Sequence, residues 1–158
     1  MMKPFGRKRR RLSTVSTDLD LLEGLPLATL ILDCDLTVLA VNRACHRLLG
    51  PRFPSSTVRS FPALWSMLTQ SDTTTITIRL NGVLKNRRPT SARQHLLLRR
   101  TTLPVPVEWT CAPSTFNGKT VLIITIRDLS HELELEQDRN RLAAIAEESP
   151  LPTIELDR

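Results

Sequence analysis

The chain of 158 residues has only three cysteines and three histidines, the side chains most often used to bind zinc. Cys34, Cys45 and Cys111 are odd in number and irregularly spaced, which argues against a disulfide framework and fits a reducing compartment. Zinc would need paired ligands, such as two cysteines separated by two residues, and the adjacent Cys45 and His46 have no matching second pair. The sequence therefore predicts no metal site.

Enzymatic chemistry has equally little support. The sequence Ser130-His131-Glu132-Leu133 resembles the start of the phosphoacceptor box of histidine kinases, but that motif continues with Arg-Thr-Pro and here Glu134-Leu135-Glu136 follows. We expect His131 to be a surface residue in the first turn of a helix. The chain also lacks a glycine-rich phosphate loop, a Ser-His-Asp set and paired carboxylates, so the sequence predicts that it is not an enzyme.

The positive charge of the chain is concentrated at its N-terminus. Residues 1–11 contain six lysines and arginines and no acid, which leaves 16 basic residues of the total 22 against all 16 acidic ones. We expect residues 1–17 to be a disordered basic arm, either a solubilising tail or a contact through residues 3–11 with nucleic acid or an anionic membrane. No apolar run approaches the ~20 residues of a membrane span, and no apolar segment follows the basic run as in a secretory signal. We therefore expect a cytoplasmic protein.

The elements around these residues begin with a predicted hairpin. A short helix is expected before Gly24, then strands at 27–32 and 36–41, joined by a turn at Asp33-Cys34-Asp35. Asn42 is expected to cap a helix that places Cys45 on its apolar face and ends at Gly50.

The middle of the chain is less regular. Phe61, Leu64, Trp65 and Leu68 are spaced as one helical face, whereas the β-branched residues 73–78 are compatible with either a helix or a strand. Three strands are expected next, at 94–100, 105–111 and 120–127. The last two are joined at Asn117-Gly118, a strong hairpin signal because both residues tolerate positive φ.

From residue 129 the pattern changes to that of an amphipathic helix, predicted over 129–148, in which Leu135 and Leu142 are seven residues apart. Beyond it, the octapeptide that begins at Pro26 recurs in similar form at Pro150, 124 residues later. We interpret residues 149–158 as the first strand of a second, truncated copy of the same module.

Taken together, these motifs resemble those of PAS domains of bacterial sensor proteins. Residues 42–50 are similar to the family's Asn-x-x-Ala-x-x-x-Leu-Gly helix, Pro106-Val107-Glu108 to its Pro-Val-Glu strand, and Arg127-Asp128-Leu129-Ser130 to the Arg-Asp-Ile-Thr that ends the domain. Two features depart from the pattern: the turn at Cys34-Asp35 lacks a glycine, and the Arg-Lys-Asp-Gly before the third strand is absent. The resemblance implies an α+β fold over 18–128, a five-stranded antiparallel sheet with short helices on one face, followed by an amphipathic signalling helix.

The same resemblance implies a function. We expect a cytoplasmic PAS sensory and relay module of a larger signalling protein, of the histidine kinase, diguanylate cyclase or transcriptional regulator type. It would bind a small ligand or a partner on the concave face of the sheet and pass the change through the C-terminal helix. The signalling joint is assigned to Asp128 and Ser130, and the fold motif to Asp33, Asn42 and Gly50. The candidate ligand pocket is lined by Trp65, Leu68, Leu80, Leu84, Leu97, Trp109 and Ile124.

Cofactor and partners stay open at this point. The flavin-bonding motif Asn-Cys-Arg-Phe-Leu-Gln is missing, and His95 is expected on a strand rather than on the helix that carries the haem ligand of other members, so neither flavin nor haem is supported. The expected partners are downstream domains and a second copy, through the helix at 129–148, the N-terminal helix or both. The alternative function is a ligand-free dimerisation module whose basic arm contacts nucleic acid or a membrane surface.

Overall fold

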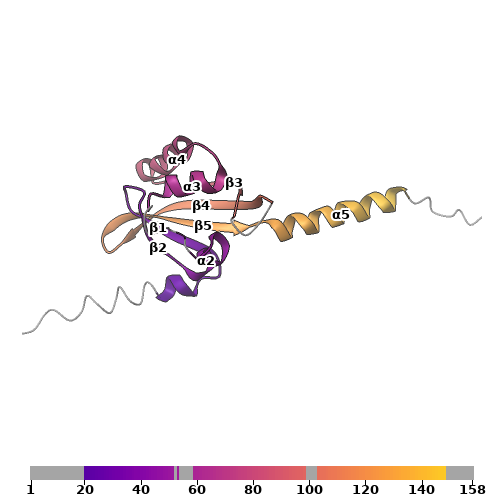
Figure 1. Ribbon diagram of the computed structural model, residues 1–158, viewed down its shortest axis with the longest axis horizontal. Helices are drawn as coiled ribbons and strands as arrows, with labels where there is room; N and C mark the ends of the chain where they lie inside the picture. The colour runs from indigo at the N-terminus through magenta and orange to yellow at the C-terminus, as the bar shows by residue number, and fades with distance from the viewer. Residues whose placement is uncertain (1–19, 52, 54–58, 99–102, 149–158) are drawn as a thin grey trace, which may run out of the picture. The chain divides into compact units, whose positions relative to one another are not determined.

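Five antiparallel strands form a single sheet in the computed structural model, which describes residues 20–51, 53, 59–98 and 103–148. The sheet order is β2-β1-β5-β4-β3, so the first hairpin lies beside the last strand (Figure 1). The predicted five-stranded antiparallel sheet is confirmed. The strands are β1 (Ala28–Leu32), β2 (Val38–Val41), β3 (Thr90–Leu96), β4 (Val105–Phe116) and β5 (Lys119–Asp128).

Between β2 and β3 the described residues form three helices: α2 (Arg43–Leu49), α3 (Phe61–Thr69) and α4 (Thr73–Asn86). The segment left open between helix and strand is therefore helical. Its apolar residues Ile76, Leu80 and Val83 are spaced by four and three, and all three are buried. Burial of that face outweighs the preference of the threonines for extended backbone.

The two faces of the sheet are covered differently. Alternate strand residues, such as Leu30, Trp109 and Ile124, form one core with buried residues of α2, α3 and α4. The opposite face carries a smaller cluster in which Leu22, from the helical turn at 20–23, packs with Ile31 and Val121. The three short helices thus share one face, here called the inner face, and the N-terminal turn covers part of the other.

Asn42 ties the first hairpin to α2. Its Oδ1 accepts hydrogen bonds from the backbone N–H of Cys45 (2.9 Å) and of Thr29 (3.0 Å). Its Nδ2 donates to the carbonyls of Leu25 (3.2 Å) and Leu27 (2.8 Å). The predicted cap is confirmed, and this fully buried amide also fixes the strand that precedes it.

The predicted turns are confirmed as well. The carboxylate of Asp33 accepts from the N–H groups of Asp35 (3.0 Å) and Thr37 (2.8 Å). Gly50 ends α2 at φ 104°, and Asn117-Gly118 closes the last hairpin with φ values of 51° and 74°. All three positions need positive φ, which glycine and asparagine supply at low cost.

The boundaries of β3 were predicted wrongly. The strand runs from Thr90 to Leu96 rather than over 94–100, because its ladder with β4 pairs Thr90 with Cys111 and ends where Leu96 meets Val105. The next residue, Leu97, leaves the ladder and donates its N–H to the carbonyl of Leu68 (2.7 Å).

The chain divides into two compact units between Asp128 and Leu129. The second unit contains α5 (Ser130–Glu148), a helix of 19 residues that agrees with the predicted one. No helix in the described part of the chain is long and apolar enough to cross a membrane. The predicted basic arm and the predicted second copy at 149–158 lie outside the described residues.

Candidate functional site

Three aromatic rings occupy the inner face between α3 and β4. Phe61 stacks on Trp65 with ring centroids 5.3 Å apart, and Trp65 meets Trp109 edge-on at 5.9 Å. All three side chains are at most 1% exposed. This group, here called the aromatic cluster, includes Trp65 and Trp109, two residues that the sequence analysis assigned to a ligand pocket.

A single side chain satisfies both indoles. Gln94 Oε1 accepts a hydrogen bond from Trp65 Nε1 (2.8 Å) and another from Trp109 Nε1 (3.2 Å). A buried indole N–H without an acceptor would be costly, so Gln94 is what permits two tryptophans here. Sequence reasoning missed this residue, although a polar side chain at an inward position between Ala92 and Leu96 was a usable signal.

The structure brings most of the predicted pocket residues together as packed core. Leu80 and Ile124 are fully buried with the aromatic cluster, and Leu68 and Leu84 are half-buried against it. Leu97 is the exception. It follows the end of β3, and its neighbour Leu98 packs against the core instead. Apart from Leu97, the predicted pocket residues thus belong to one apolar core or pack against it.

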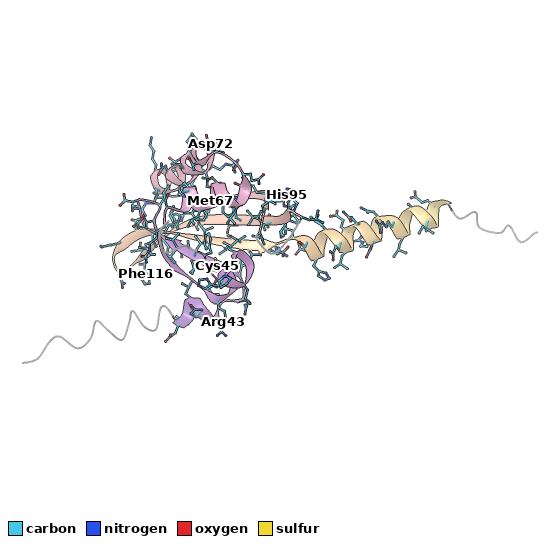
Figure 2. All side chains as sticks on the ribbon, viewed as in Figure 1. Arg43, Cys45, Met67, Asp72, His95 and Phe116 are labelled. Atoms are coloured by element: carbon cyan, nitrogen blue, oxygen red, sulfur yellow. The ribbon has the colours of Figure 1, made fainter. Side chains whose placement is uncertain are left out.

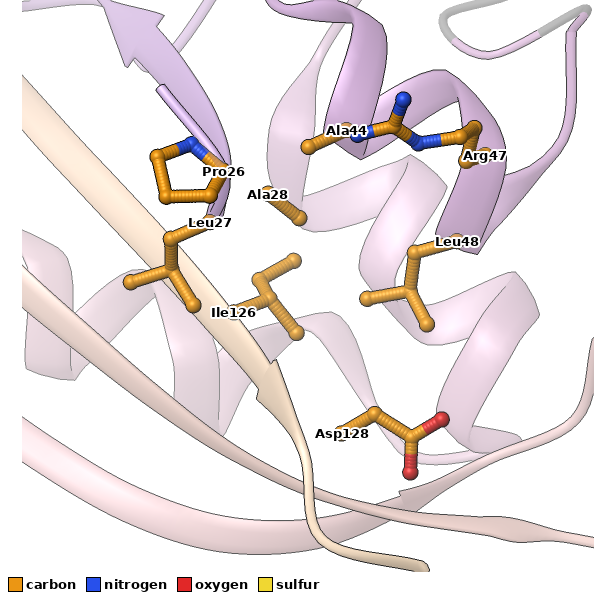
Figure 3. Close-up of a pocket in the computed structure, with 8 residues that line it drawn as sticks. All are labelled: Pro26, Leu27, Ala28, Ala44, Arg47, Leu48, Ile126 and Asp128. Atoms are coloured by element: carbon orange, nitrogen blue, oxygen red, sulfur yellow. The ribbon is translucent and has the colours of Figure 1, made fainter.

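An open groove lies elsewhere on the inner face, where α2 meets β1 and the end of β5. Its volume is about 290 Å³. Ala28, Ala44 and Ile126 contribute buried apolar surface, while Arg47 and Asp128 are exposed. We call it the α2 groove (Figure 3); it is lined by Pro26, Leu27, Ala28, Ala44, Arg47, Leu48, Ile126 and Asp128.

The predicted signalling joint begins at this groove. Asp128 is the last residue of β5, pairs with Val107 of β4 and lines the groove. Ser130 is the first residue of α5, so only Leu129 separates the strand from the helix. Sequence reasoning named Asp128 but missed Arg47, because nothing in the local pattern of α2 connects it to the end of β5.

The cysteines differ sharply in environment. Burial raises the pKa of both the Cys45 thiol and the Cys111 thiol to about 12, so both stay protonated near neutral pH. Cys34 is exposed, and its thiol donates to the carbonyl of Thr120 (3.3 Å). Cys45 is therefore a core residue of α2, as predicted.

Of the three histidines, His46 follows Cys45 on α2, and the other two lie on elements that carry no cysteine. His95 is exposed on β3, on a different element from Cys45 (Figure 2), and His131 is exposed in the first turn of α5. Among the residues that the structure describes, no three His, Cys, Asp or Glu side chains are grouped so as to hold a metal ion.

Comparison with known proteins places these features in a family. A family model described as PAS fold matches residues 22–133. The PAS domain of nitrogen regulation protein NR(II) from Vibrio parahaemolyticus is 22% identical, with a TM-score of 0.51 over 70% of this chain and 96% of that one. The PAS domain of an HTR-like protein from Haloarcula marismortui is also 22% identical, with a TM-score of 0.55 over 77% and 99%.

Another solved structure matches more of this chain but is itself a longer protein. An RNA-binding light-oxygen-voltage receptor is 15% identical, with a TM-score of 0.58 over 91% of this chain and 41% of that one. At such identities the likeness to solved structures shows the fold alone. A comparison with curated protein sequences finds no match.

Proposed function

Because this chain belongs to the PAS family, we propose that it is a cytoplasmic sensory relay module of a larger signalling protein. PAS domains are commonly sensory modules in signalling proteins, and the solved relatives include a PAS domain from a two-component sensor histidine kinase. In this proposal the module catalyses no reaction itself and changes the state of α5.

The observation that carries the proposal is the continuity of β5 and α5. β5 is a central strand that pairs with β1 on one side and with β4 on the other. The pairing with β4 reaches Asp128 itself, the pairing with β1 reaches Ile126, and α5 begins two residues after Asp128. A strand held on both sides moves as a unit with its neighbours, so its end is a suitable place to pass a change to a helix.

The aromatic cluster restricts where the input can act. Its rings contact one another, and Gln94 satisfies both indoles, so a ligand placed between these rings would have to displace packed side chains. Emptying such a core is costly, since removing one large buried side chain destabilises a domain by about 3–5 kcal/mol. We therefore favour an input at the surface over a haem or flavin in the interior.

The exposed side of α5 supports a second copy as partner. Leu135, Leu142 and Ile145 follow a seven- and three-residue spacing and are 52%, 68% and 64% exposed. This spacing is that of a short helix-pairing seam, and burying it against an identical helix would remove apolar surface from water. The expected assembly is a homodimer that places two output domains side by side.

The alternative is a ligand-free module that contacts nucleic acid or a membrane, and the packing of the aromatic cluster favours the absence of a ligand there. Its contact residues 3–11 lie outside the described residues. Deletion of residues 1–15 tests it: binding to DNA, RNA or anionic vesicles that survives the deletion would exclude the arm as the contact.

The relay is tested in a fusion of residues 1–148 to a histidine kinase catalytic core. Asp128→Ala should change autophosphorylation and speed amide exchange along α5, while the domain stays folded. Loss of one helix-end contact costs ~1 kcal/mol against a typical stability of 5–15 kcal/mol. The matched control is Asp35→Ala, an exposed carboxylate in the first turn. Unchanged kinase output together with unchanged exchange in α5 would refute the relay.

A further inference from the structure

The two outermost strands of the sheet differ at their outer edges. β2 lies at one end of the sheet order, and its edge is partly occupied: Val38 donates its N–H to the carbonyl of Arg59 (2.9 Å), and Thr37 forms an isolated bridge with Ser60. A register shift against β1 also leaves Leu39 without an opposite residue. Bulges and covering segments are common means by which a protein keeps an edge from pairing with another chain.

β3, at the other end of the sheet order, has neither feature in the part of the chain that the structure describes. All of its residues, from Thr90 to Leu96, pair with β4 in one ladder without a register shift, and none of them is proline. Among the described residues, no strand pairs with its other side. Half of the backbone N–H and C=O groups of an outermost strand point away from its neighbour. This edge, here called the open edge of β3, is therefore a template for an added strand.

The segment that contains β3 is strongly basic. Between Thr73 and Val107 the sequence has seven lysines and arginines and no aspartate or glutamate. Glu108 of β4 pairs with Arg93 (3.4 Å) and so offsets one of these charges, and a net positive charge remains. Five of the seven basic residues lie in the described part of the chain, and all five are exposed: Arg79, Lys85, Arg87, Arg88 and Arg93.

This charge decides which kind of strand fits the open edge. Two β3 strands paired in register would place their two Arg93 side chains opposite each other, where like charges destabilise a sheet. A shift by two residues would put the same side chains on diagonal positions, still within reach of each other. An extended segment with acidic side chains meets no such repulsion, so the edge suits an acidic partner better than a second copy.

We propose that the open edge of β3 binds an extended acidic segment of a partner protein, which adds a strand to the sheet. Main-chain hydrogen bonds supply the affinity, and the side chains supply the preference. Acidic residues at alternate positions lie on the outer side of the sheet with the exposed residues Ser91, Arg93 and His95. On the inner side Ala92 and Gln94 are half-buried, so small or apolar residues of the partner fit there.

This contact goes beyond the proposed relay. Residues 90–96 belong to the first compact unit, and β3 pairs with β4 and not with β5, so binding at this edge requires no change in α5. Binding is measured at β3 and kinase output in the separate fusion, so failure of the contact and failure of the relay are distinguishable.

The test is a titration of the ¹⁵N-labelled full chain with the peptide acetyl-Thr-Glu-Val-Glu-Val-Glu-Thr-amide, which has the length of β3. We expect the amide signals of residues 90–96 to shift. The amides of alternate β3 residues, those that point away from β4, should exchange more slowly with solvent. Binding should weaken as salt is added, because the basic side chains are exposed. The Kd is taken from the β3 signals, so contacts of the peptide with the basic residues 1–11 do not enter it.

Two control peptides separate charge from strand addition. A peptide with lysine in place of each glutamate should bind roughly tenfold more weakly, because three attractive contacts become repulsive. A peptide of the original sequence that is N-methylated at every residue keeps its charge but donates no backbone hydrogen bond. It should leave the exchange of the β3 amides unchanged.

Variants of the protein test the charge from the other side. The double variant Arg88→Gln and Arg93→Gln should raise the Kd of the acidic peptide roughly three- to tenfold. The matched control is Arg43→Gln, an exposed arginine on α2 and outside the basic segment, which should leave the Kd unchanged. Circular dichroism of each variant checks that the fold is retained.

Several results would overturn the proposal. Equal binding of the acidic and the lysine peptide would remove the acidic partner, and equal effects of the N-methylated peptide would show charge attraction without an added strand. β3 signals that shift with protein concentration alone would show that a second copy occupies the edge. A single-stranded oligothymidylate that shifts the same amides as strongly as the acidic peptide would assign the basic segment to nucleic acid.

Discussion

Between α3 and β4 the inner face of the sheet is filled by three aromatic rings, whereas at α2 the same face carries alanines and stays open. The difference is one of side-chain volume at comparable positions. Trp109 of β4 reaches across to Trp65, while Ala28 of β1 faces Ala44 of α2 in a groove of about 290 Å³. One sheet thus has a region that stabilises the domain through contacts with itself and another with room for a different molecule.

Truncation of a side chain in the aromatic cluster should have the largest effect on stability of the changes considered for the two regions. Trp109→Ala should lower the free energy of unfolding by about 3–5 kcal/mol, because the domain loses a fully buried side chain and gains a cavity. Urea denaturation measures the change. Leu39→Ala, at a side chain that is 53% exposed, is the control and should cost no more than about 0.5 kcal/mol.

The same variant gives a second readout. If the cluster does occupy the space of a ligand, added indole should raise the melting temperature of Trp109→Ala and leave that of the wild type unchanged, since binding to the folded state alone stabilises it. A wild-type protein that also gains stability from indole would mean that the interior already has room for a ligand.

Removal of the shared acceptor should have the next largest effect. Gln94→Leu keeps similar bulk but leaves two buried indole N–H groups without a partner, which we expect to cost about 1–3 kcal/mol. Gln137→Leu, on the exposed surface of α5, is the matched control. An equal and small loss in both variants would show that the indoles find another acceptor.

The stability of the domain at alkaline pH tests how well each region excludes water from a buried thiol, Cys111 of β4 and Cys45 of α2. Burial raises the pKa of each thiol from 9.0 to about 12, so between those values the unfolded chain loses a proton that the folded chain keeps. Stability is therefore fully present below about pH 9 and falls above it, by at most about 1.4 kcal/mol per pH unit for each thiol.

Urea denaturation at several pH values above 9 checks this dependence. Cys45→Ala and Cys111→Ala should each lessen the slope, and the control Cys34→Ala, at an exposed thiol, should not. Equal slopes in all four proteins would mean that water reaches the buried thiols.

Local chemistry made much of this fold predictable. The Asp33 turn, the Asn42 cap and the Asn117-Gly118 hairpin depend on backbone preferences of a few adjacent residues, and each was assigned correctly. The ends of β3 depend instead on its ladder with β4, which stops at Leu96. Because residues 96–98 are all leucine, the sequence predicted that the strand continues beyond that point.

The sites were harder to predict for the same reason. Gln94 acquires its role only because α3 and β4 bring two indoles to one oxygen. Arg47 and Asp128 line one groove although 80 residues separate them in sequence. A single sequence carries no direct signal of such contacts, so the predicted pocket followed apolar periodicity and led to the packed core.

The last prediction concerns apolar side chains that lie in neither region. Leu142 of α5 is 68% exposed, so Leu142→Ser should change domain stability by less than about 0.5 kcal/mol, the smallest effect expected here. Its effect on association should be large, because it lies at the centre of the seam formed with Leu135 and Ile145. We expect at least a tenfold weaker dimer by sedimentation over a range of concentrations. Ala143→Ser, one residue further, lowers helix propensity by a similar amount outside the seam, and it should associate like the wild type. If the two variants behave alike, or if the wild type is monomeric throughout, α5 does not pair with a second copy. Its exposed leucines would then serve a different partner or none.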